Sequence, residues 1–187
     1  GGRDYSGGWS TLLTDLMAVG DEVEMFMVPN KRFRLPQDPN ADTIMVGPGT
    51  GIAPFIAFLE ERRATQASGE NWLFFGDRNA ATDFIYQDRL EALQGDGYLH
   101  HLHTAFSRDG TDKVYVQHRM FEEGAALFAA LEGGATFYLC GDAKRMAPDV
   151  EAALLNIISE HGAKTPEDSV RYLSDMRRGG RYLKDVY

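Results

Sequence analysis

The chain has 187 residues, and 43% of them are hydrophobic, so it can bury the core of one domain or slightly more. Its net charge of −9, with basic residues scattered along the chain, offers no extended surface for nucleic acid or anionic lipid. No run approaches the roughly 18 apolar residues that a membrane span needs. The composition therefore indicates an acidic globular protein that binds neither nucleic acid nor membranes.

A single cysteine, Cys140, excludes an internal disulfide framework and is typical of a reducing compartment. The first residues, Gly1-Gly2-Arg3, lack an initiator methionine and carry no secretory signal. We therefore expect a cytoplasmic protein, and we interpret the chain as part of a longer one.

Turn signals and hydrophobic periodicity indicate the elements in chain order. Gly20-Asp21 predicts a turn, and the strand expected after it, residues 22–28, would close a sheet that begins further upstream. From Thr43 onward, short apolar runs alternate with helical segments. The predicted strands are residues 43–46, 72–75, 98–105 and 136–139, and the predicted helices are residues 55–63, 84–93, 116–131 and 146–161.

Two more elements complete the pattern. Thr165-Pro166 supplies a hydroxyl cap and a proline for a helix that reaches about Arg177, where Gly179-Gly180 ends it. Residues 181–187 form a final extended segment. Alternating strands and helices are typical of a βαβ series, so we predict an α/β fold with a doubly wound, five-stranded parallel sheet.

A glycine-rich segment, Gly47-Pro48-Gly49-Thr50-Gly51, follows the first apolar run of that series. It lacks the usual G-x-G-x-x-G spacing. A glycine turn between strand and helix nevertheless presents backbone N–H groups and a helix dipole to a pyrophosphate, and the Thr50 hydroxyl and Pro54 suit that use. The alternative is a tight strand-to-helix turn that binds nothing.

A second polar segment, Ser107-Arg108 followed by Lys113 and Tyr115, begins where the third apolar run ends. Because open α/β sheets bind ligands beyond the carboxyl ends of their strands, we expect it near the glycine segment. Its hydroxyl, guanidinium, ammonium and ring suit an adenosine 2′-phosphate, and Ser107, Arg108 and Lys113 stand at the position where an acidic residue would bind a ribose 2′-hydroxyl. The segment predicts NADPH in preference to NADH, with an ordinary polar turn as the alternative.

Cysteine and histidine residues offer two further candidate groups. Cys140 ends the strand at 136–139, where its thiol would lie beside a bound nicotinamide, although a lone cysteine there is more often a small buried apolar residue. His101 and His103 share one strand face, with His100 beside them, but no carboxylate or thiol completes a metal site. We therefore predict no metal site and interpret the histidines as part of a surface strand.

Five motifs, in order and spacing, resemble the ferredoxin–NADP reductase-like module of the diflavin reductases over nearly the whole chain. They are residues 44–55, 105–108, 113–117 and 138–142, and Arg181-Tyr182 with Asp185-Val186-Tyr187. Residues 33–36 and 71–76 and the Asp-Val-Tyr ending are most similar to flavoproteins of NADPH-dependent sulfite reductases. The resemblance implies a C-terminal remnant of an antiparallel FAD-binding β-barrel domain at residues 1–40, and an NADPH-binding domain at residues 41–187.

The same resemblance implies roles for individual residues in binding NADPH. Gly49 and Thr50 would bind the pyrophosphate. The expected contacts of the 2′-phosphate and adenine are Ser107, Arg108, Lys113 and Tyr115, and the further expected contacts are Arg78, Gln117 and Asp142. Cys140 and Asp185 would flank the nicotinamide, and Tyr187 would stack on the flavin as a gate that moves aside before hydride transfer.

For the flavin itself, the resemblance implies a turn that holds the FAD pyrophosphate, formed by Gly7, Gly8, Ser10 and Thr11. The alternative is that Ser10 simply caps a helix. Arg3-Asp4-Tyr5-Ser6 matches the R-x-Y-S flavin motif of the family letter for letter, but it lies too close to Gly7-Gly8, so we interpret this match as coincidence.

The activity that the resemblance implies is oxidation of NADPH. The hydride would pass to FAD, and electrons would then pass through FMN, in a domain that precedes this chain, to a haem-containing acceptor such as a sulfite reductase haemoprotein. Two alternatives remain: an NADP(H)-binding fragment without turnover of its own, and a reductase for another haem protein such as a monooxygenase. Flavin content distinguishes the first alternative from an active reductase.

Overall fold

The computed structural model describes residues 16–24, 26 and 30–187, which fall into two units, residues 1–31 and 32–187. In the first unit, the Asp21 N–H donates to the Ala18 carbonyl at 3.1 Å and Gly20 has a φ of +106°, so the predicted turn is confirmed. No strand is assigned to the described residues before Thr43, and these include 22–24 and 26 of the predicted strand. The barrel remnant therefore stays a prediction.

The second unit is built on a five-stranded sheet in which every pairing is parallel. Its strands are β1 (Thr43–Val46), β2 (Asn71–Asp77), β3 (His101–Phe106), β4 (Thr136–Gly141) and β5 (Tyr182–Val186). They lie in the order β3-β2-β1-β4-β5, so β1 is central and the chain changes direction there. The predicted doubly wound parallel sheet is confirmed.

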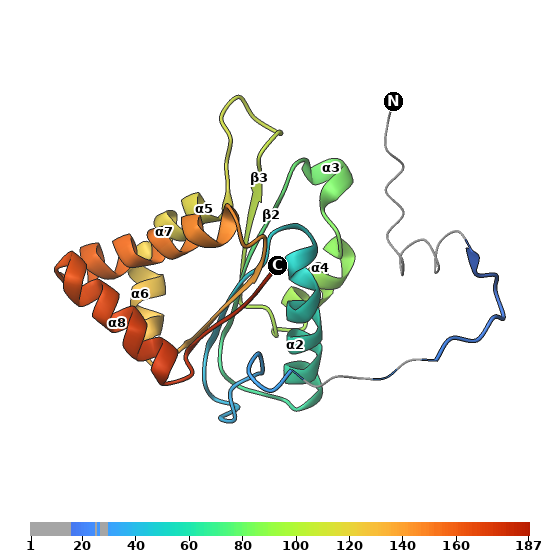
Figure 1. The fold of residues 1–187 in the computed structure, drawn as a ribbon, viewed down its shortest axis with the longest axis horizontal. Helices are drawn as coiled ribbons and strands as arrows, with labels where there is room; N and C mark the ends of the chain where they lie inside the picture. The colour runs from blue at the N-terminus through green and yellow to red at the C-terminus, as the bar shows by residue number, and fades with distance from the viewer. Residues whose placement is uncertain (1–15, 25, 27–29) are drawn as a thin grey trace. The chain divides into compact units, whose positions relative to one another are not determined.

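Helices cover both faces of this sheet, as Figure 1 shows, with α5 to α8 on one side and α2 and α4 on the other. Their bounds are η2 (Gly49–Ile52), α2 (Ala53–Ala64), α3 (Ala80–Asp83), α4 (Gln87–Gly95), α5 (Val116–Glu122), α6 (Gly124–Glu132), α7 (Met146–His161) and α8 (Pro166–Arg178). Within the described part of the chain, no helix combines the length and the apolar character needed to cross a membrane.

Every residue of β1 and β4 is buried, and successive side chains point alternately into the two cores, one on each face of the sheet. Ile44 and Val46 pack into the core beneath α5 to α8, whereas Met45 packs into the core beneath α2 and α4. Burial on both faces explains why these strands are continuous apolar runs in the sequence.

Two predicted helices differ in the structure. The segment 84–93 becomes helical only at Gln87, because Tyr86 has a left-handed φ of +62° that no helical residue adopts. The segment 116–131 is broken at Glu123, before α6 begins at Gly124. A Cβ on Gly124 would lie 2.6 Å from Nε2 of His161, so a larger residue there would have to displace this exposed side chain at the end of α7.

The residues before β1 pack on the sheet through an aromatic group. Phe33 stacks on Phe58 at 5.6 Å between ring centroids and meets the edge of Tyr138 at 5.5 Å. The Tyr138 hydroxyl donates to the Arg34 carbonyl at 2.7 Å, and burial raises the pKa of this tyrosine. Residues 32–40 therefore belong to the compact second unit, while the domain boundary at residue 40 stays a prediction.

Candidate functional site

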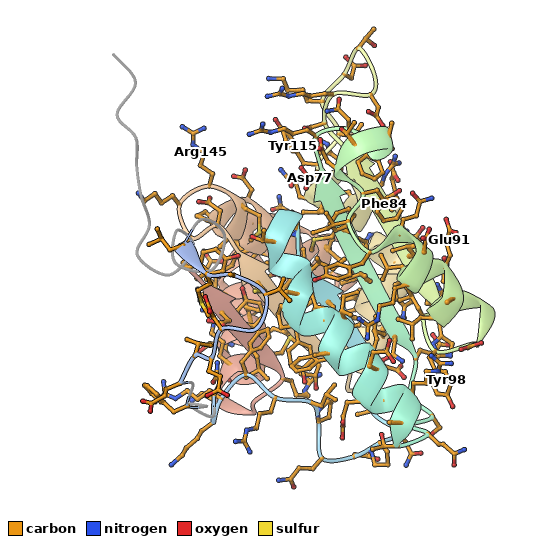
Figure 2. The ribbon with its side chains drawn as sticks, turned by 90° about the vertical axis from the view of Figure 1, so that its right-hand side faces the viewer. Asp77, Phe84, Glu91, Tyr98, Tyr115 and Arg145 are labelled. Carbon is orange, nitrogen blue, oxygen red and sulfur yellow. The ribbon has the colours of Figure 1, made fainter. Side chains whose placement is uncertain are left out.

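A cleft of about 500 Å³ opens at the carboxyl ends of β1 to β4. Its lining comes from the segments that follow these strands and from the start of α5: Pro48, Gly49, Gly76, Asp77, Arg78, Ala105, Ser107, Tyr115, Val116, Gln117, Asp142, Arg145, Met146 and Asp149. Figure 2 shows Asp77, Tyr115 and Arg145 at this same end of the second unit. Open α/β sheets bind their ligands in this position, and the volume is typical of a small-molecule site.

The glycine loop after β1 is pressed against the end of β4. A Cβ on Gly51 would lie 2.3 Å from the carbonyl oxygen of Cys140, and Gly49 has a φ of +56°. The Gly51 N–H donates to the Pro48 carbonyl at 3.1 Å, which closes the loop. No described side chain caps η2, and its first N–H groups have no partner within the helix. The loop therefore brings bare backbone close to a ligand.

The loops after β2 and β3 are joined by backbone hydrogen bonds. The N–H groups of Ser107 and Arg108 donate to the carbonyls of Asp77 and Arg78, at 2.9 and 2.8 Å. The Ala80 N–H donates to a carboxylate oxygen of Asp109 at 2.9 Å. These bonds extend the sheet beyond its strands and hold Arg78 and Ser107 side by side in the wall of the cleft.

The start of α5 is fixed against β3. Nε of Arg119 donates to the Thr104 carbonyl at 2.9 Å, and the Tyr115 N–H donates to Nδ1 of His118 at 3.1 Å. The Tyr115 side chain lines the cleft and remains 43% exposed, so its ring is available for stacking. This arrangement can bind an aromatic base at the β3 side of the cleft.

Several cations at this edge of the sheet form no ion pair among the described residues. Elsewhere, arginines form ion pairs, such as Arg63 with Asp96 and Arg89 with Glu60. Five cations at the strand ends form no ion pair within 4.0 Å among the described residues: Arg78, Arg108, Lys113, Lys144 and Arg145. These cations are available to bind an anion, and two of them, Arg78 and Arg145, line the cleft together with the carboxylates Asp77, Asp142 and Asp149.

Asp142 lines the cleft and also caps the helix that forms one of its walls. One of its carboxylate oxygens accepts hydrogen bonds from the N–H groups of Arg145 and Met146, at 2.6 and 3.2 Å. These bonds lower the pKa of the carboxyl, which is therefore ionised at neutral pH. The turn between β4 and α7 is held in one conformation as a result.

The last residue is tied to the glycine loop. The Tyr187 N–H donates to the Gly141 carbonyl at 3.1 Å, and its own carbonyl accepts from the Ala143 N–H at 3.0 Å. Its hydroxyl lies 3.0 Å from Oγ1 of Thr50, across 137 residues of sequence. The Tyr187 side chain is still 69% exposed, so its ring is held in place at the surface and is not buried.

Cys140 lies outside the cleft lining, in the core beneath α2 and α4. It is 3% exposed and stands opposite Asp185 in the register of β4 and β5. Burial, with a smaller contribution from Asp185, raises the pKa of the thiol to about 11. The group is therefore neutral at physiological pH and unsuited to act as a nucleophile.

Six of the predicted NADPH contacts line the cleft together: Gly49, Arg78, Ser107, Tyr115, Gln117 and Asp142. Arg108 and Lys113 are exposed on the loop between β3 and α5, which projects beyond the sheet in Figure 1. Thr50 and Tyr187 meet at the glycine loop, and Cys140 and Asp185 lie on β4 and β5. The predicted flavin contacts Gly7, Gly8, Ser10 and Thr11 lie outside the described residues.

Four polar or flexible side chains of the cleft were not among the residues predicted from the sequence: Asp77, Arg145, Met146 and Asp149. Asp77 was missed because the predicted strand ended at Phe75, two residues before the end of β2. Arg145, Met146 and Asp149 lie at the start of α7, which the order of the strands brings to the cleft.

The histidines of β3 pack against aromatic residues of β2. His101 stacks on Trp72 at 3.7 Å and His103 on Phe74 at 4.7 Å between ring centroids. Nε2 of His101 lies 3.2 Å from a Glu70 carboxylate oxygen, and burial lowers the pKa of His103. No group of three potential metal ligands occurs in the described ranges.

A doubly wound parallel sheet with a glycine loop and a cleft at its switch point is the architecture of a dinucleotide-binding domain. The sequence of residues 45–152, more than half of the chain, matches the family described as oxidoreductase NAD-binding domain. The chain belongs to this family.

More specifically, the chain is similar to sulfite reductase [NADPH] flavoprotein alpha-components. It is 50% identical over 186 residues to that of Mannheimia succiniciproducens, 48% over 181 residues to that of Aliivibrio fischeri and 47% over 186 residues to that of Bacillus subtilis. These alignments cover 100%, 97% and 100% of the chain but 31%, 30% and 31% of the relatives. The resemblance found in the sequence is confirmed, and the chain spans about a third of these relatives.

Replacing Gly51 by alanine should destabilise the fold because the new Cβ meets the Cys140 carbonyl oxygen at 2.3 Å. We expect a loss of about 1–3 kcal/mol in the free energy of unfolding, measured in urea. Gly95→Ala is the matched control, since this exposed helical glycine has nothing within 4 Å of the added Cβ and should show no loss. Equal stability of the two variants would contradict the close approach of the loop to β4.

The thiol of Cys140 should react slowly with a disulfide reagent in the folded protein, because a pKa of about 11 against an ordinary 9 leaves little thiolate. At pH 8 we expect roughly 100-fold slower modification than in the chain unfolded in guanidinium. Cys140 is the sole cysteine, so the absorbance of the released thiolate reports on this residue alone. A native rate close to the unfolded rate would show that the thiol is accessible and ionised.

Proposed function

We propose that this chain is the NADPH-binding module of a flavoprotein reductase, in which NADPH binds across the carboxyl edge of the sheet and passes a hydride to FAD. The observation that carries the proposal is the cleft at the glycine loop, which Arg78 and Arg145 line without forming an ion pair to any described residue. The names of the relatives, which include NADPH and flavoprotein, support the same activity. The acceptor beyond the flavin is proposed to be reached through FMN in another part of the whole protein.

The strand order supports one direction for the dinucleotide. The 2′-phosphate and adenine would bind at the β3 side, where Ser107 and Tyr115 line the cleft and Arg108 and Lys113 stand on the adjoining loop. The pyrophosphate would lie at β1, against Gly49 and Thr50. The nicotinamide would then reach the β4 and β5 side, close to Tyr187. The strands lie in the order β3-β2-β1-β4-β5. Adenine, pyrophosphate and nicotinamide would therefore lie along the edge of the sheet in the same order as they occur in the cofactor.

At the nicotinamide end, the chain would contribute orientation and a dry surface and no proton transfer. Cys140, whose thiol is neutral, and Asp185 are paired in register on β4 and β5, near the carboxyl ends of these strands. Tyr187 is held by two backbone hydrogen bonds and by its hydroxyl, so its ring covers this end until a ligand displaces it. Hydride transfer requires close alignment of donor and acceptor, which such packing provides.

FAD, when bound, supplies the hydride acceptor, and its proposed contacts Gly7, Gly8, Ser10 and Thr11 lie outside the described residues. The flavin part of the proposal therefore rests on the resemblance and on the names of the relatives. A haem-containing partner, as in a sulfite reductase, is proposed on the same basis. A cytoplasmic location remains the expectation from the cysteine content.

Replacing both Arg108 and Lys113 by glutamine should lower the affinity for NADP⁺ by about 100-fold, because two charge-assisted contacts to the 2′-phosphate are lost. The affinity for NAD⁺, which lacks that phosphate, should change by less than about threefold, as measured by calorimetry. The double change Arg171→Gln and Arg178→Gln removes the same charge from exposed positions on α8 and should leave both ligands unaffected. Equal weakening of NADP⁺ and NAD⁺ would contradict the assignment of the 2′-phosphate.

Replacing Tyr187 by phenylalanine should raise the affinities for NADP⁺ and NAD⁺ alike by about fivefold. The ligand would no longer have to break the hydrogen bond between the Tyr187 hydroxyl and Thr50. Tyr187→Ala should give at least the same gain, since the ring is also removed. Adenosine 2′-monophosphate, which lacks pyrophosphate and nicotinamide, is the control ligand and should bind all three proteins equally. Unchanged affinities for both dinucleotides would exclude the gate.

A further inference from the structure

We propose that Arg145 is a second pyrophosphate-binding arginine, which contacts the ligand from the β4 side of the glycine loop while Arg78 contacts it from the β2 side. The inference rests on the proposed function of the cleft. It assigns to Arg145 the positioning of the two central phosphates, separate from recognition of the 2′-phosphate.

The strand register places the two arginines on either side of the glycine loop. Val46, the last residue of β1, pairs with Phe74 of β2 and with Leu139 of β4, and these two strands continue beyond it to Asp77 and Gly141. Neighbouring strands lie about 4.8 Å apart, so the loop after β1 stands between the loops after β2 and β4. Arg78 and Arg145 follow those two outer strands, and both line the same cleft as Gly49.

The backbone of Arg145 is fixed while its guanidinium has no partner. The Arg145 N–H donates to Asp142 at 2.6 Å, and its carbonyl accepts from the Asp149 N–H at 3.2 Å. Its side chain projects in Figure 2 at the same end of the second unit as Asp77 and Tyr115. No described carboxylate forms an ion pair with it, whereas Arg177, which packs beside the same helix, is paired with Glu151. The guanidinium is therefore free to bind an anion in the cleft.

The negative charges on the β4 side of the cleft explain why an arginine is needed at position 145. Asp142 and Asp149 also line the β4 side of the cleft, and Asp142 is held ionised by its two backbone hydrogen bonds. A pyrophosphate at the glycine loop brings further negative charge next to these carboxylates. Arg145 is the cation that lines the cleft on this side, so it can offset that repulsion and bind phosphate oxygens in a bidentate manner.

The 2′-phosphate should be outside the reach of this arginine. Ser107 follows β3, which is two strands from β1, whereas Arg145 follows β4 on the opposite side of the glycine loop. Ligands that carry only one of the two phosphate groups can therefore separate the roles. ADP-ribose has the pyrophosphate without a 2′-phosphate, and adenosine 2′-monophosphate has the reverse.

The test is calorimetry of the unmodified chain and of Arg145→Gln with NADP⁺, ADP-ribose and adenosine 2′-monophosphate. We expect Arg145→Gln to lower the affinities for NADP⁺ and ADP-ribose by about tenfold and to change the affinity for adenosine 2′-monophosphate by less than about twofold. Arg145→Lys, which keeps the charge and loses the bidentate geometry, should recover part of the loss.

Arg171→Gln is the matched control, because it removes the same charge from an exposed position on α8 that does not line the cleft. It should leave all three affinities within about twofold, and the urea midpoints of Arg145→Gln and of the unmodified chain should agree, since the Arg145 side chain has no ion-pair partner in the described structure. An unchanged affinity for ADP-ribose in Arg145→Gln, or an equal loss for adenosine 2′-monophosphate, would overturn the inference. Failure of the unmodified chain to bind any of the three ligands would instead contradict the proposed function.

Discussion

The contact between Gly51 and the Cys140 carbonyl is the constraint on which the site depends. A Cβ would lie 2.3 Å from that oxygen, so the loop after β1 can lie against the end of β4 only with glycine at this position. The approach turns the chain directly from the central strand into η2 and α2. It also leaves room at the strand ends for a cleft that the neighbouring loops complete. Removing the contact would move the glycine loop relative to both proposed arginines.

Whether the cleft can attract an anion depends on which arginines are paired with carboxylates there, and not on the net charge of the chain. The chain is acidic, and its arginines elsewhere are mostly compensated by carboxylates or by backbone carbonyls, as Arg181 is by Leu131 and Ala135. At the strand ends, the Asp142 carboxylate accepts hydrogen bonds from backbone N–H groups, and the Arg145 guanidinium forms no ion pair with any described residue. The proposed anion site would therefore use an arginine that is left unpaired in an otherwise acidic protein.

The sequence predicted the fold well because buried parallel strands are short apolar runs with clear boundaries. Residues 43–46 and 146–161 were predicted with the bounds of β1 and α7. The left-handed φ of Tyr86 and the helix break at Glu123 were missed because neither leaves a periodic signal. The glycine loop and Ser107 were found from their chemistry. The position of Arg145 in the cleft was not predicted, because it depends on the order of the strands. The hydrogen bond between Thr50 and Tyr187 was not predicted either, because it joins residues that are 137 positions apart in the sequence.

The central claim is that this edge of the sheet binds a dinucleotide through its phosphates and selects the phosphorylated form. The most direct measurement is a calorimetric titration of the unmodified chain with NADPH and with NADH, with the visible flavin spectrum recorded on the same sample. The account predicts that NADPH binds about 100-fold more tightly than NADH, because charge-assisted contacts to the 2′-phosphate are absent from NADH. Equal affinities, or no binding of either dinucleotide, would contradict it.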